Sequence, residues 1–500
     1  MGRDIAPVAG QSDHPAPSSE ALHPDVLVVG GGPAGLAAAV AAARQGCSTM
    51  LLERYGFVGG TPVAALVGPM MTFHAGSRAV VGGIGQEIVD KLVQMEASPG
   101  HVPDMIGFVP SLTPFDPEAL KDVALDLVLG SGVQLCLHCC AASVQVDRGR
   151  IESVRAFGRW GELEIHPAFV VDATGDADIA ARGGFSFEIG RPGDGLVQPA
   201  TLILRVGGVD LAELRQYVAD HPDDFVLGCA PGEIMEFPWL SVAGFFSIVK
   251  KARERGEFGV PRDRVLAFQG IHPGEMLINM TRVHVRPGSL QELTRAEVEG
   301  RRQSQEVLRF LRRYVPGFRQ AYLMQSGVQV GFRESRRIVG HYVLTARDVV
   351  QGSRLPDAVA MGGFPIDIHS PAGKGLGAYQ PAAPLGYEIP LRALIPAGAK
   401  NLLVAGRCIS STHEAHASVR ATPTCFATGQ AAGTAAAVAA KEGILDLSSV
   451  ADLQAVQVGT AAATGGAKLI RLVQEALLSA GAIFNSSLVR KEDAHMRASR

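Results

Sequence analysis

Three glycines near the start of the chain have the spacing of a phosphate-binding turn. Gly30, Gly32 and Gly35 match the pattern G-x-G-x-x-G, in which bare backbone lets N–H groups and a helix N-terminus approach a pyrophosphate. A side chain at Gly32 would fill the space of the phosphate. Glu53 follows Gly35 by 18 residues, where a carboxylate can accept hydrogen bonds from a ribose. Together these residues predict a dinucleotide site.

The segments on either side of the turn predict the elements that would hold it. VLVVG is an apolar run of strand length, and PAGLAAAVAAARQG has a helix-forming composition that ends at Gly46. STMLLE then predicts a second strand, with Glu53 at its end. This order of strand, helix and strand is the context that a glycine pattern needs before it indicates nucleotide binding.

Two later segments predict further parts of the same site. FVVDATGDADIAARGG contains a buried strand that runs into a turn of small residues and the carboxylate of Asp176. NLLVAGR predicts a strand over residues 402–405, which is followed by a polar loop and a long helix. Thr422 is the expected N-cap of that helix, Pro423 suits its first position, and Gly443 ends it.

The N-terminus of this helix would favour negative charge in a neighbouring cofactor. A reduced flavin carries negative charge around N1 and the C2 carbonyl, whereas a nicotinamide makes no such demand. Thr424 and the stretch TGQAAG, with Gly429 and Ala432, would make close contacts there. A second interpretation, in which the small residues from Gly429 to Ala440 allow close helix packing, can hold at the same time.

Six segments resemble one family in sequence and in order. They are DVLVVGGGPAGLAAAVAAARQG, LLERYGFVGGTPVAALVGP, VVDATGDAD, GFRESRRIVGHYVLT, YEIPLRALIP and NLLVAGRCISSTHEAHASVRATPTCFATGQAAGTAAA. They extend from Asp25 to Ala440 and resemble the FAD-dependent oxidoreductases related to the flavoprotein subunits of fumarate reductase and succinate dehydrogenase. The resemblance implies FAD as the cofactor.

The resemblance also implies which residues hold FAD. The glycine turn would bind the pyrophosphate, Glu53 the adenosine ribose, and Asp176 would face the cofactor. Gly406 and Arg407 would meet the ribityl chain or the pyrophosphate, and the closing helix would present its N-terminus to the isoalloxazine ring. The complete implied set is Gly30, Gly32, Pro33, Ala34, Gly35, Glu53, Arg54, Gly59, Gly60, Thr61, Asp176, Gly406, Arg407, Thr424, Gly429 and Ala432.

Cofactor motifs at both ends of the chain predict an α/β fold with a discontinuous, Rossmann-like FAD-binding domain of the glutathione-reductase type. Its expected parts are residues 23–190 and 393–445, with an α+β substrate or cap domain inserted at 191–392. We expect residues 1–22 to form a disordered tail and residues 446–500 to form a helical segment and a tail.

The inserted part contains strand-like segments and one long helical pattern. PATLILRVGGVD, EMLINMTRVHV and DAVAMGGFPIDIH predict strands, and residues 293–315 predict a helix. The apolar side of that helix consists of Leu293, Val298, Val307, Leu308 and Leu311. GFRESRRIVGHYVLTARDV can belong to either domain.

Hydride transfer at flavin N5 also needs a group that accepts or supplies a proton. Candidates are the polar residues in apolar or glycine-rich surroundings: His74, Arg333, Glu334, Asp367, His369, His413, Glu414, His416 and Arg420. We select His369 and His413 as catalytic residues and Arg333 as an anion clamp or proton carrier. The alternative for each histidine is a surface or core position without a role in the reaction.

These features predict an FAD-dependent oxidoreductase that transfers a hydride between a small organic substrate and flavin N5, by dehydrogenation of a C–C, C–O or C–N bond. The alternatives are a flavin-dependent monooxygenase and a flavin electron-carrier subunit that works with a partner protein. The sequence leaves the electron acceptor open between oxygen, a quinone and a protein. It contains no second G-x-G-x-x-G unit, which disfavours a built-in NAD(P)H domain.

Composition and charge disfavour nucleic acid and membranes as partners. A net charge of −3 with 19% charged residues gives no basic surface for nucleic acid. No apolar run reaches about 18 residues, the length that a membrane span requires. Seven cysteines scattered along 500 residues do not form a disulfide framework, so we expect a cytoplasmic location.

Three short motifs are weak candidates for metal or phosphate sites. LCLHCC, with Cys136, Cys139 and Cys140, contains C-x-x-C, but its apolar run predicts a buried strand; a metal or redox role is the alternative. HEAH lacks the second histidine of H-E-x-x-H, because position 417 is alanine, and it is expected in a loop. PAGKGLG lacks the Ser or Thr that a phosphate-binding loop needs after Lys374. We therefore expect no metal.

Overall fold

The computed structural model describes residues 21–159, 161–286, 288–371, 373, 376–451, 465–485 and 487. Most of the tail expected at residues 1–22 lies outside the described residues, but Leu22 is described and pairs with Ile165. The tail expected at the C-terminus, from residue 488 on, also lies outside them.

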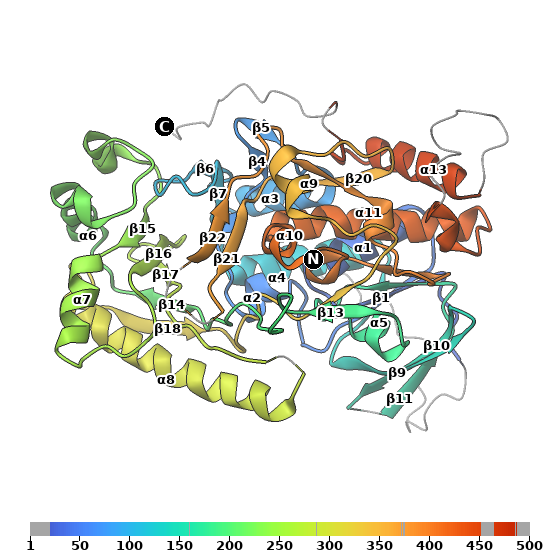
Figure 1. The fold of residues 1–500 in the computed structure, drawn as a ribbon, viewed down its shortest axis with the longest axis horizontal. Helices are drawn as coiled ribbons and strands as arrows, with labels where there is room; N and C mark the ends of the chain where they lie inside the picture. Colours follow the sequence, from blue (N-terminus) through green and yellow to red (C-terminus); the bar gives the residue numbers. More distant parts are fainter. Residues whose placement is uncertain are drawn as a thin grey trace.

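A parallel five-stranded sheet forms the centre of one half of the molecule, on the right in Figure 1. Its order is β24(Leu402–Val404), β12(Phe169–Asp172), β1(Val26–Val29), β2(Thr49–Leu52) and β8(Gln134–Cys136). Every residue of β1, β2 and β12 is buried, as in strands that are covered on both faces. The predicted strand, helix and strand are confirmed, because α1(Pro33–Arg44) joins β1 to its parallel neighbour β2.

Helix α11(Thr422–Lys441) packs directly on α1, and the contact depends on glycine (Figure 1). A Cβ atom at Gly429 would lie 2.1 Å from the carbonyl oxygen of Ala34, and one at Gly433 would lie 2.1 Å from that of Ala38. Neither position can accept a side chain unless the helices separate. The interpretation of these small residues as packing residues is therefore confirmed.

The start of α11 corrects the predicted cap. Ala421 is the N-cap and Thr422 is the first helical residue, so Thr422 does not cap the helix. Pro423 lies in the first turn, where its missing N–H costs no helical hydrogen bond. Gly443, with φ of +62°, follows the C-cap Glu442, as the sequence predicts.

A short helix occupies the segment HEAH, where a loop was expected. The hydroxyl of Thr412, the N-cap of α10(His413–Val419), accepts a hydrogen bond from the N–H of Ala415. His413 and His416 are buried with the apolar residues of the same helix. The loop prediction is wrong because it weighted the polar composition of the segment above its threonine cap.

The segment LCLHCC is not one buried strand. β8 ends at Cys136, and β9(Cys139–Asp147) begins after His138, which has φ of +55°. Cys139 is buried, whereas Cys140 is exposed. β9 belongs to a separate antiparallel sheet with β10(Arg150–Gly158) and β11(Gly161–Ile165). No three His, Cys, Asp or Glu side chains of the described residues are grouped so that they could hold a metal ion.

A second five-stranded sheet, which is antiparallel, lies in the other half of the molecule (Figure 1). Its order is β15(Ser241–Gly244), β16(Val265–Gln269), β17(Met276–Ile278), β14(Leu204–Gly207) and β18(Tyr322–Ser326). The helices α6(Leu211–Asp220), α7(Phe246–Glu254) and α8(Leu290–Tyr314) pack on it around a hydrophobic core of their own.

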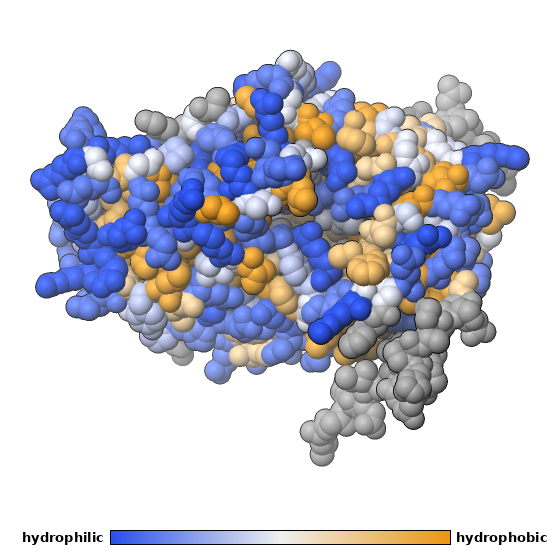
Figure 2. Space-filling view, turned by 90° about the horizontal axis from the view of Figure 1, so that it is seen from below, coloured by the Kyte–Doolittle hydropathy of each residue, from blue (hydrophilic) through white to orange (hydrophobic). Residues whose placement is uncertain are grey.

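Helix α8 confirms the helix predicted over residues 293–315, but not its whole apolar face. Val307 and Leu311 are fully buried, whereas Leu293 and Val298 are 37% and 45% exposed. The C-terminal half of α8 therefore covers the sheet, while the N-terminal half extends beyond it. Seen from below, the surface of the molecule is mostly hydrophilic with scattered apolar patches (Figure 2). None of the described helices is long and apolar enough to cross a membrane.

The remaining elements surround the two sheets. Between β2 and β8 they are α2(Thr61–Ala64), β3(Met70–Met71), β4(His74–Ala75), β5(Arg78–Ala79), α3(Gly83–Gln94), β6(Val102–Pro103), β7(Ser111–Thr113) and α4(Pro117–Gly130). Later in the chain come α5(Asp178–Arg182), β13(Phe187–Ile189), β19(Arg336–Ile338), α9(Ala346–Gln351), β20(Ala358–Gly362), β21(Ile366–His369), β22(Leu376–Gln380), β23(Tyr387–Pro390) and α13(Gly465–Ser479). Residues of β20 and β23 share the hydrophobic core of α1 and α11.

The contact between α1 and α11 leads to a test by calorimetry. We expect Gly433→Ala to lower the melting temperature of the apoprotein, because overpacking a tight contact costs about 1–3 kcal/mol. Gly130→Ala, at the end of α4, is the matched control, since an added Cβ meets no atom within 4 Å. The control should melt at or slightly above the wild-type temperature. Equal melting of the two variants would contradict the packing argument.

Candidate cofactor and substrate site

A cavity of about 1750 Å³ is lined by residues from both halves of the molecule. Pockets that hold one drug-sized ligand measure about 300–1000 Å³. The cavity therefore has room for a dinucleotide and a second small molecule. At one end it contains the glycine turn between β1 and α1, and elsewhere it reaches the charged residues of β21 and the loops beside it.

The three glycines of the turn are required for different physical reasons. Gly30 has φ of +99°, and a Cβ there would lie 2.6 Å from the carbonyl oxygen of Ala173. A Cβ at Gly35 would lie 1.6 Å from the carbonyl oxygen of Gly30. Gly32 is different, because its Cβ would meet only Gly60 Cα, at 3.7 Å, and Gly32 lines the cavity. The fold thus requires Gly30 and Gly35, whereas only a ligand would require Gly32.

The N-terminus of α1 is open toward the cavity. Its N-cap is Gly32, and no side chain accepts hydrogen bonds from the first-turn N–H groups. These donors and the positive end of the helix dipole suit a pyrophosphate. Gly60 and Thr61, at the start of α2, line the cavity beside them.

Glu53 is held at the end of β2 by backbone donors. Its Oε2 accepts a hydrogen bond from the N–H of Gly31 at 2.5 Å, and its Oε1 accepts one from the N–H of Tyr55 at 2.8 Å. Burial raises the pKa of the Glu53 carboxyl, and these two N–H groups partly offset the rise. The side chain lines the cavity, where its remaining lone pairs can accept hydrogen bonds from ribose hydroxyls.

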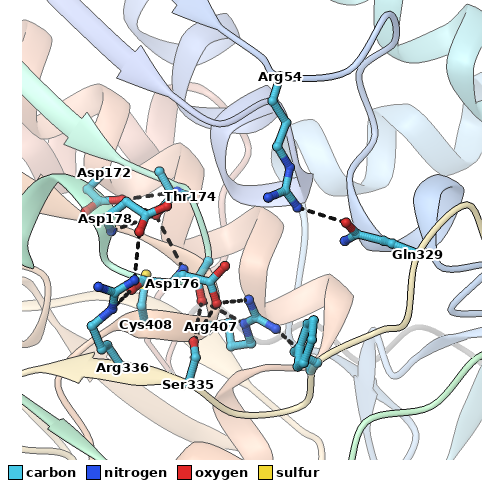
Figure 3. Close-up of polar contacts among 12 residues, drawn as sticks. Arg54, Asp172, Thr174, Asp176, Asp178, Gln329, Ser335, Arg336, Arg407 and Cys408 are labelled. Atoms are coloured by element: carbon cyan, nitrogen blue, oxygen red, sulfur yellow. Dashed lines mark hydrogen bonds and ion pairs between the residues drawn. The ribbon is translucent and has the colours of Figure 1, made fainter. Parts of the chain in front are cut away.

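Asp176, in the loop after β12, is tied to two distant segments (Figure 3). Its Oδ1 pairs with Arg407 Nη2 at 2.7 Å and accepts a hydrogen bond from the Ser335 hydroxyl at 2.6 Å. Arg336 pairs with Asp178, the first residue of α5, at 2.7 Å. Asp176 lines the cavity, as the resemblance implies, but Arg407 already compensates its charge.

Arg54 lies apart from this network and contacts the segment before β19 (Figure 3). Its Nη2 donates a hydrogen bond to Gln329 Oε1 at 3.2 Å, and the Tyr55 hydroxyl donates to the same oxygen. Arg54 and Gln329 both line the cavity. The pair therefore links the end of β2 to the part of the chain that carries the second sheet.

The N-terminus of α11 also faces the cavity. Ala421, Thr422 and Cys425 are among the lining residues, and no side chain caps the first turn. Burial raises the pKa of the Cys425 thiol to about 12, so this side chain is neutral. The free N–H groups of the turn are therefore the polar feature that α11 offers a ligand.

The predicted cofactor residues divide into two groups. Those that line the cavity are Gly30, Gly32, Pro33, Ala34, Glu53, Arg54, Gly60, Thr61, Asp176, Gly406 and Arg407. Those outside the described lining are Gly35, Gly59, Thr424, Gly429 and Ala432. The α11 residues of the second group are turned toward the protein interior, and Gly429 contacts α1 instead of the cavity.

His369 and Asp367 form a pair on one face of β21. His369 Nε2 lies 3.1 Å from Asp367 Oδ2, as expected for residues two apart on a strand. Burial and then the charge of Arg333 lower the pKa of His369 to about 3, and Asp367 offsets them only in part. Burial alone would raise the pKa of Asp367, but His369, Arg420 and Arg333 hold it below its usual value. The pair is therefore a neutral imidazole and an ionised carboxylate.

Arg333 and Arg420 bring positive charge to the same part of the cavity, which both line. Arg333 Nη1 donates hydrogen bonds to the carbonyl of Pro199 at 2.6 Å and to the hydroxyl of Thr201 at 2.5 Å. Arg420 Nη2 lies 3.6 Å from Asp367 Oδ2. Burial, followed by the charge of Arg420, lowers the pKa of Arg333.

The other selected histidine, His413, is not part of the described cavity lining. Its Nδ1 lies 2.8 Å from Glu334 Oε1, and the same oxygen accepts a hydrogen bond from Arg337 at 2.6 Å. His413, Glu334 and Arg337 are all buried. The structure therefore places His413 in an internal ion-pair network beside β19, away from the position of a reacting group.

Arg262 is a cavity residue that the sequence reasoning missed. It lines the cavity with Asp263 and Arg264, immediately before β16, and its side chain is buried. The segment PRDRVLAF has the composition of a surface loop followed by a strand. Two arginines directly before an apolar strand were the feature of the sequence that could have indicated Arg262. Without the fold, this feature does not distinguish a cavity residue from a surface residue.

The parallel sheet, the glycine turn and the two uncapped helix N-termini define a protein that binds a dinucleotide in the manner of the Rossmann fold. The chain belongs to the FAD dependent oxidoreductase family, whose model matches residues 25–458. The protein is therefore an FAD-dependent enzyme, and the predicted cofactor is confirmed. The residues present fit FAD, because the space beside Gly32 is open at the uncapped N-terminus of α1, where a pyrophosphate can bind, and Glu53 can accept hydrogen bonds from a ribose.

Known proteins with partial similarity include reductases and monooxygenases. Digeranylgeranylglycerophospholipid reductase 1 from Methanopyrus kandleri is 31% identical over 152 residues. The match covers 30% of this chain and 39% of the reductase, so the chain spans well under half the length of that relative. Among solved structures, a geranylgeranyl bacteriochlorophyll reductase-like protein from Thermoplasma acidophilum has 12% identity and a TM-score of 0.43, with 93% of this chain and 85% of that chain covered. A p-nitrophenol 4-monooxygenase from Pseudomonas putida has 13% identity and a TM-score of 0.45, with coverages of 92% and 98%.

The separate roles of the glycines lead to a binding test. We expect Gly32→Ala to weaken the binding of FAD by the apoprotein at least about tenfold, or about 1.4 kcal/mol, because the methyl group occupies pyrophosphate space. The melting temperature of the apoprotein should not change, since the added Cβ meets only Gly60 Cα at 3.7 Å. Titration with FAD, followed by quenching of flavin fluorescence, measures the affinity. Gly130→Ala is the control, and equal affinities for the two variants would refute the assignment.

Proposed function

We propose that the enzyme transfers a hydride between a small organic substrate and N5 of FAD, and that His369 accepts the proton that leaves the substrate. The observation that carries the proposal is one continuous cavity that contains both the glycine turn and the buried pair of His369 and Asp367. A dinucleotide that extends from the turn toward α11 leaves the charged part of the cavity for the substrate.

His369 is in the neutral protonation state that a proton acceptor needs. A neutral imidazole whose Nε2 carries hydrogen can donate to Asp367 Oδ2, which leaves the lone pair of Nδ1 available. Nδ1 is buried and has no hydrogen-bond partner among the described residues. Asp367 would fix the ring and stabilise the imidazolium, and Arg333 would favour the later release of the proton.

The proposed step balances with FAD as the oxidant. One C–H bond of the substrate breaks and its hydrogen leaves with the electron pair, while a neighbouring O–H, N–H or C–H bond loses its proton to His369. FAD supplies the two-electron acceptor for this chemistry when it is bound. The N–H groups at the start of α11 would provide positive potential beside it.

The proposal also assigns a separate role to each half of the molecule. Residues 23–190 and 393–445 would bind FAD, and residues 191–392 would provide most of the substrate surface. The separate core of the second sheet supports this division. Buried residues between positions 344 and 395 belong to the same hydrophobic core as α1. The end of the inserted segment is therefore packed against the half that would bind FAD.

Several finer predictions from the sequence stay predictions. They are the relation to fumarate reductase and succinate dehydrogenase, the direction of dehydrogenation and the cytoplasmic location. The partially matching relative is named as a reductase, so the test of the function must follow the reaction in both directions. The two alternative functions, monooxygenase and electron carrier, become outcomes of that test.

The proposed function is tested by anaerobic mixing of the FAD-loaded protein with a panel of small alcohols, amines and acids. We expect one class to bleach the flavin absorption band without a partner protein, and the oxidised product to restore the band in the dithionite-reduced protein. Consumption of oxygen and NAD(P)H with an oxygenated product would identify a monooxygenase instead. Bleaching only in the presence of a second protein would identify an electron carrier.

The role of His369 is tested in the same assay. We expect His369→Gln to slow bleaching about 10²–10⁴-fold, the usual contribution of a positioned base, while FAD stays bound. His221→Gln is the control and should keep the wild-type rate, because His221 is an exposed residue at the C-cap of α6 and does not line the cavity as described.

The pH dependence supplies a second readout for His369. The pKa of His369 is lowered to about 3, so the imidazole stays neutral and able to accept a proton as the pH falls from 7.5 to 4.5. The wild-type bleaching rate should therefore show no loss centred near pH 6.5, the usual pKa of histidine. Such a loss, present in the wild type and absent in His369→Gln, would show that the base titrates normally and would refute the proposed state.

A further inference from the structure

Four arginines cluster around the substrate end of the cavity. Arg262, Arg333 and Arg420 line it, and Arg282 is buried behind it. The pKa of Arg333 is lowered by burial and then by the charges of Arg420 and Arg262, so these guanidinium groups lie close enough to repel one another. Burial of like charges is unfavourable unless anions compensate it.

The described carboxylates compensate only part of this charge. Asp367 lies 3.6 Å from Arg420 and shares its charge with His369. Asp263 is engaged by Arg264, whose Nε and Nη2 each donate to it at 2.9 Å. Glu334, which also attracts Arg420, pairs with Arg337 at 2.6 Å.

The other partners of these arginines are neutral. Arg333 donates to a carbonyl and a hydroxyl, and Arg262 Nη2 donates to the carbonyl of Asn279 at 3.3 Å. The Nε groups of Arg262 and Arg420 are buried and donate to no acceptor in the described part of the chain. Burial, followed by the charge of Arg282, lowers the pKa of Arg262 to about 10. The cluster thus has positive charge that the described carboxylates leave partly uncompensated.

The surfaces next to the cluster are apolar. Leu266 and Phe268 of β16, Ile203 before β14, and Phe108 and Phe364 on loops line the same cavity. A ligand that fills this space would place an anionic group on the arginines and an apolar body against these side chains. A planar carboxylate suits the paired N–H groups of guanidinium.

We propose that Arg262, Arg333 and Arg420 bind the carboxylate of an organic acid whose apolar body packs against Phe268 and its neighbours. This inference rests on the proposed function in one respect, since it takes this end of the cavity as the substrate side. It narrows the substrate class to carboxylic acids with an apolar body. It also assigns Arg262, which has no other evident function in the fold, as a specificity residue.

The proposal is tested with the FAD-loaded protein and sodium benzoate as the probe, by isothermal titration calorimetry and by the perturbation of the flavin spectrum. We expect benzoate to bind at least tenfold more tightly than benzamide, which has the same shape without the charge. Benzoate should also bind more tightly than acetate, which lacks the apolar body. Equal binding of benzoate and benzamide would overturn the proposal, and this comparison requires no variant.

Variants locate the binding site. Arg262→Gln and Arg333→Gln should each weaken benzoate binding at least tenfold while the protein keeps FAD and its melting temperature. Arg264→Gln is the matched control, because Arg264 lines the same cavity but is already paired with Asp263. Benzoate affinity that is unchanged in Arg262→Gln, or reduced equally in the control, would show that the anion binds elsewhere and would overturn the assignment.

The two proposals fail in different ways. Binding of benzoate is measured without turnover, so it can succeed in a protein that no member of the panel reduces. In that case the anion site stands and the hydride-transfer function falls. Conversely, bleaching by a neutral substrate in a protein that does not prefer benzoate would leave the oxidoreductase function in place and refute the carboxylate site.

Discussion

The backbone contact between α1 and α11 is the constraint on which the cavity depends. Gly429 and Gly433 bring the two helices so close that no Cβ fits between them and the carbonyl groups of α1. Since α1 follows the first strand and α11 follows the last strand of the parallel sheet, this contact fixes both ends of the nucleotide-binding half. It also directs two uncapped helix N-termini into one space. The fold therefore concentrates positive backbone potential in the cavity that we propose as the cofactor site.

Side chains bring further positive potential to the cavity. Arg262 is buried and Arg333 and Arg420 are partly exposed, and Arg420 lies near Asp367, which also pairs with a neutral histidine. Backbone dipoles and guanidinium groups thus face the same cavity, whose lining is largely apolar.

Local features could be predicted from the sequence, whereas the contacts of a side chain with distant segments could not. The glycine turn, its flanking strands and Glu53 were predictable because each has a conformational or chemical requirement within a few residues. The small residues of α11 were ambiguous, because close packing against α1 and contact with a ring call for the same amino acids. Gly429 and Ala432 serve the packing, as their burial shows.

The histidines show a similar limit. His369 and His413 both met the same sequence criterion, and only the fold reveals that one lines the cavity while the other pairs with Glu334 in the interior. The sequence signal for Arg262 was too weak to use, because its position depends on how β16 approaches the first half of the molecule. Long-range pairing of this kind leaves little mark on the neighbouring sequence.

The contact between the first and last helices also has a consequence for biosynthesis. Cys47, which follows α1, donates a hydrogen bond to the carbonyl of Ala437, 390 residues later. A ribosome must therefore synthesise the chain as far as α11 before that helix can cover α1. The cavity is also incomplete until then, because Ala421, Thr422 and Cys425 of α11 and its N-cap are part of the lining.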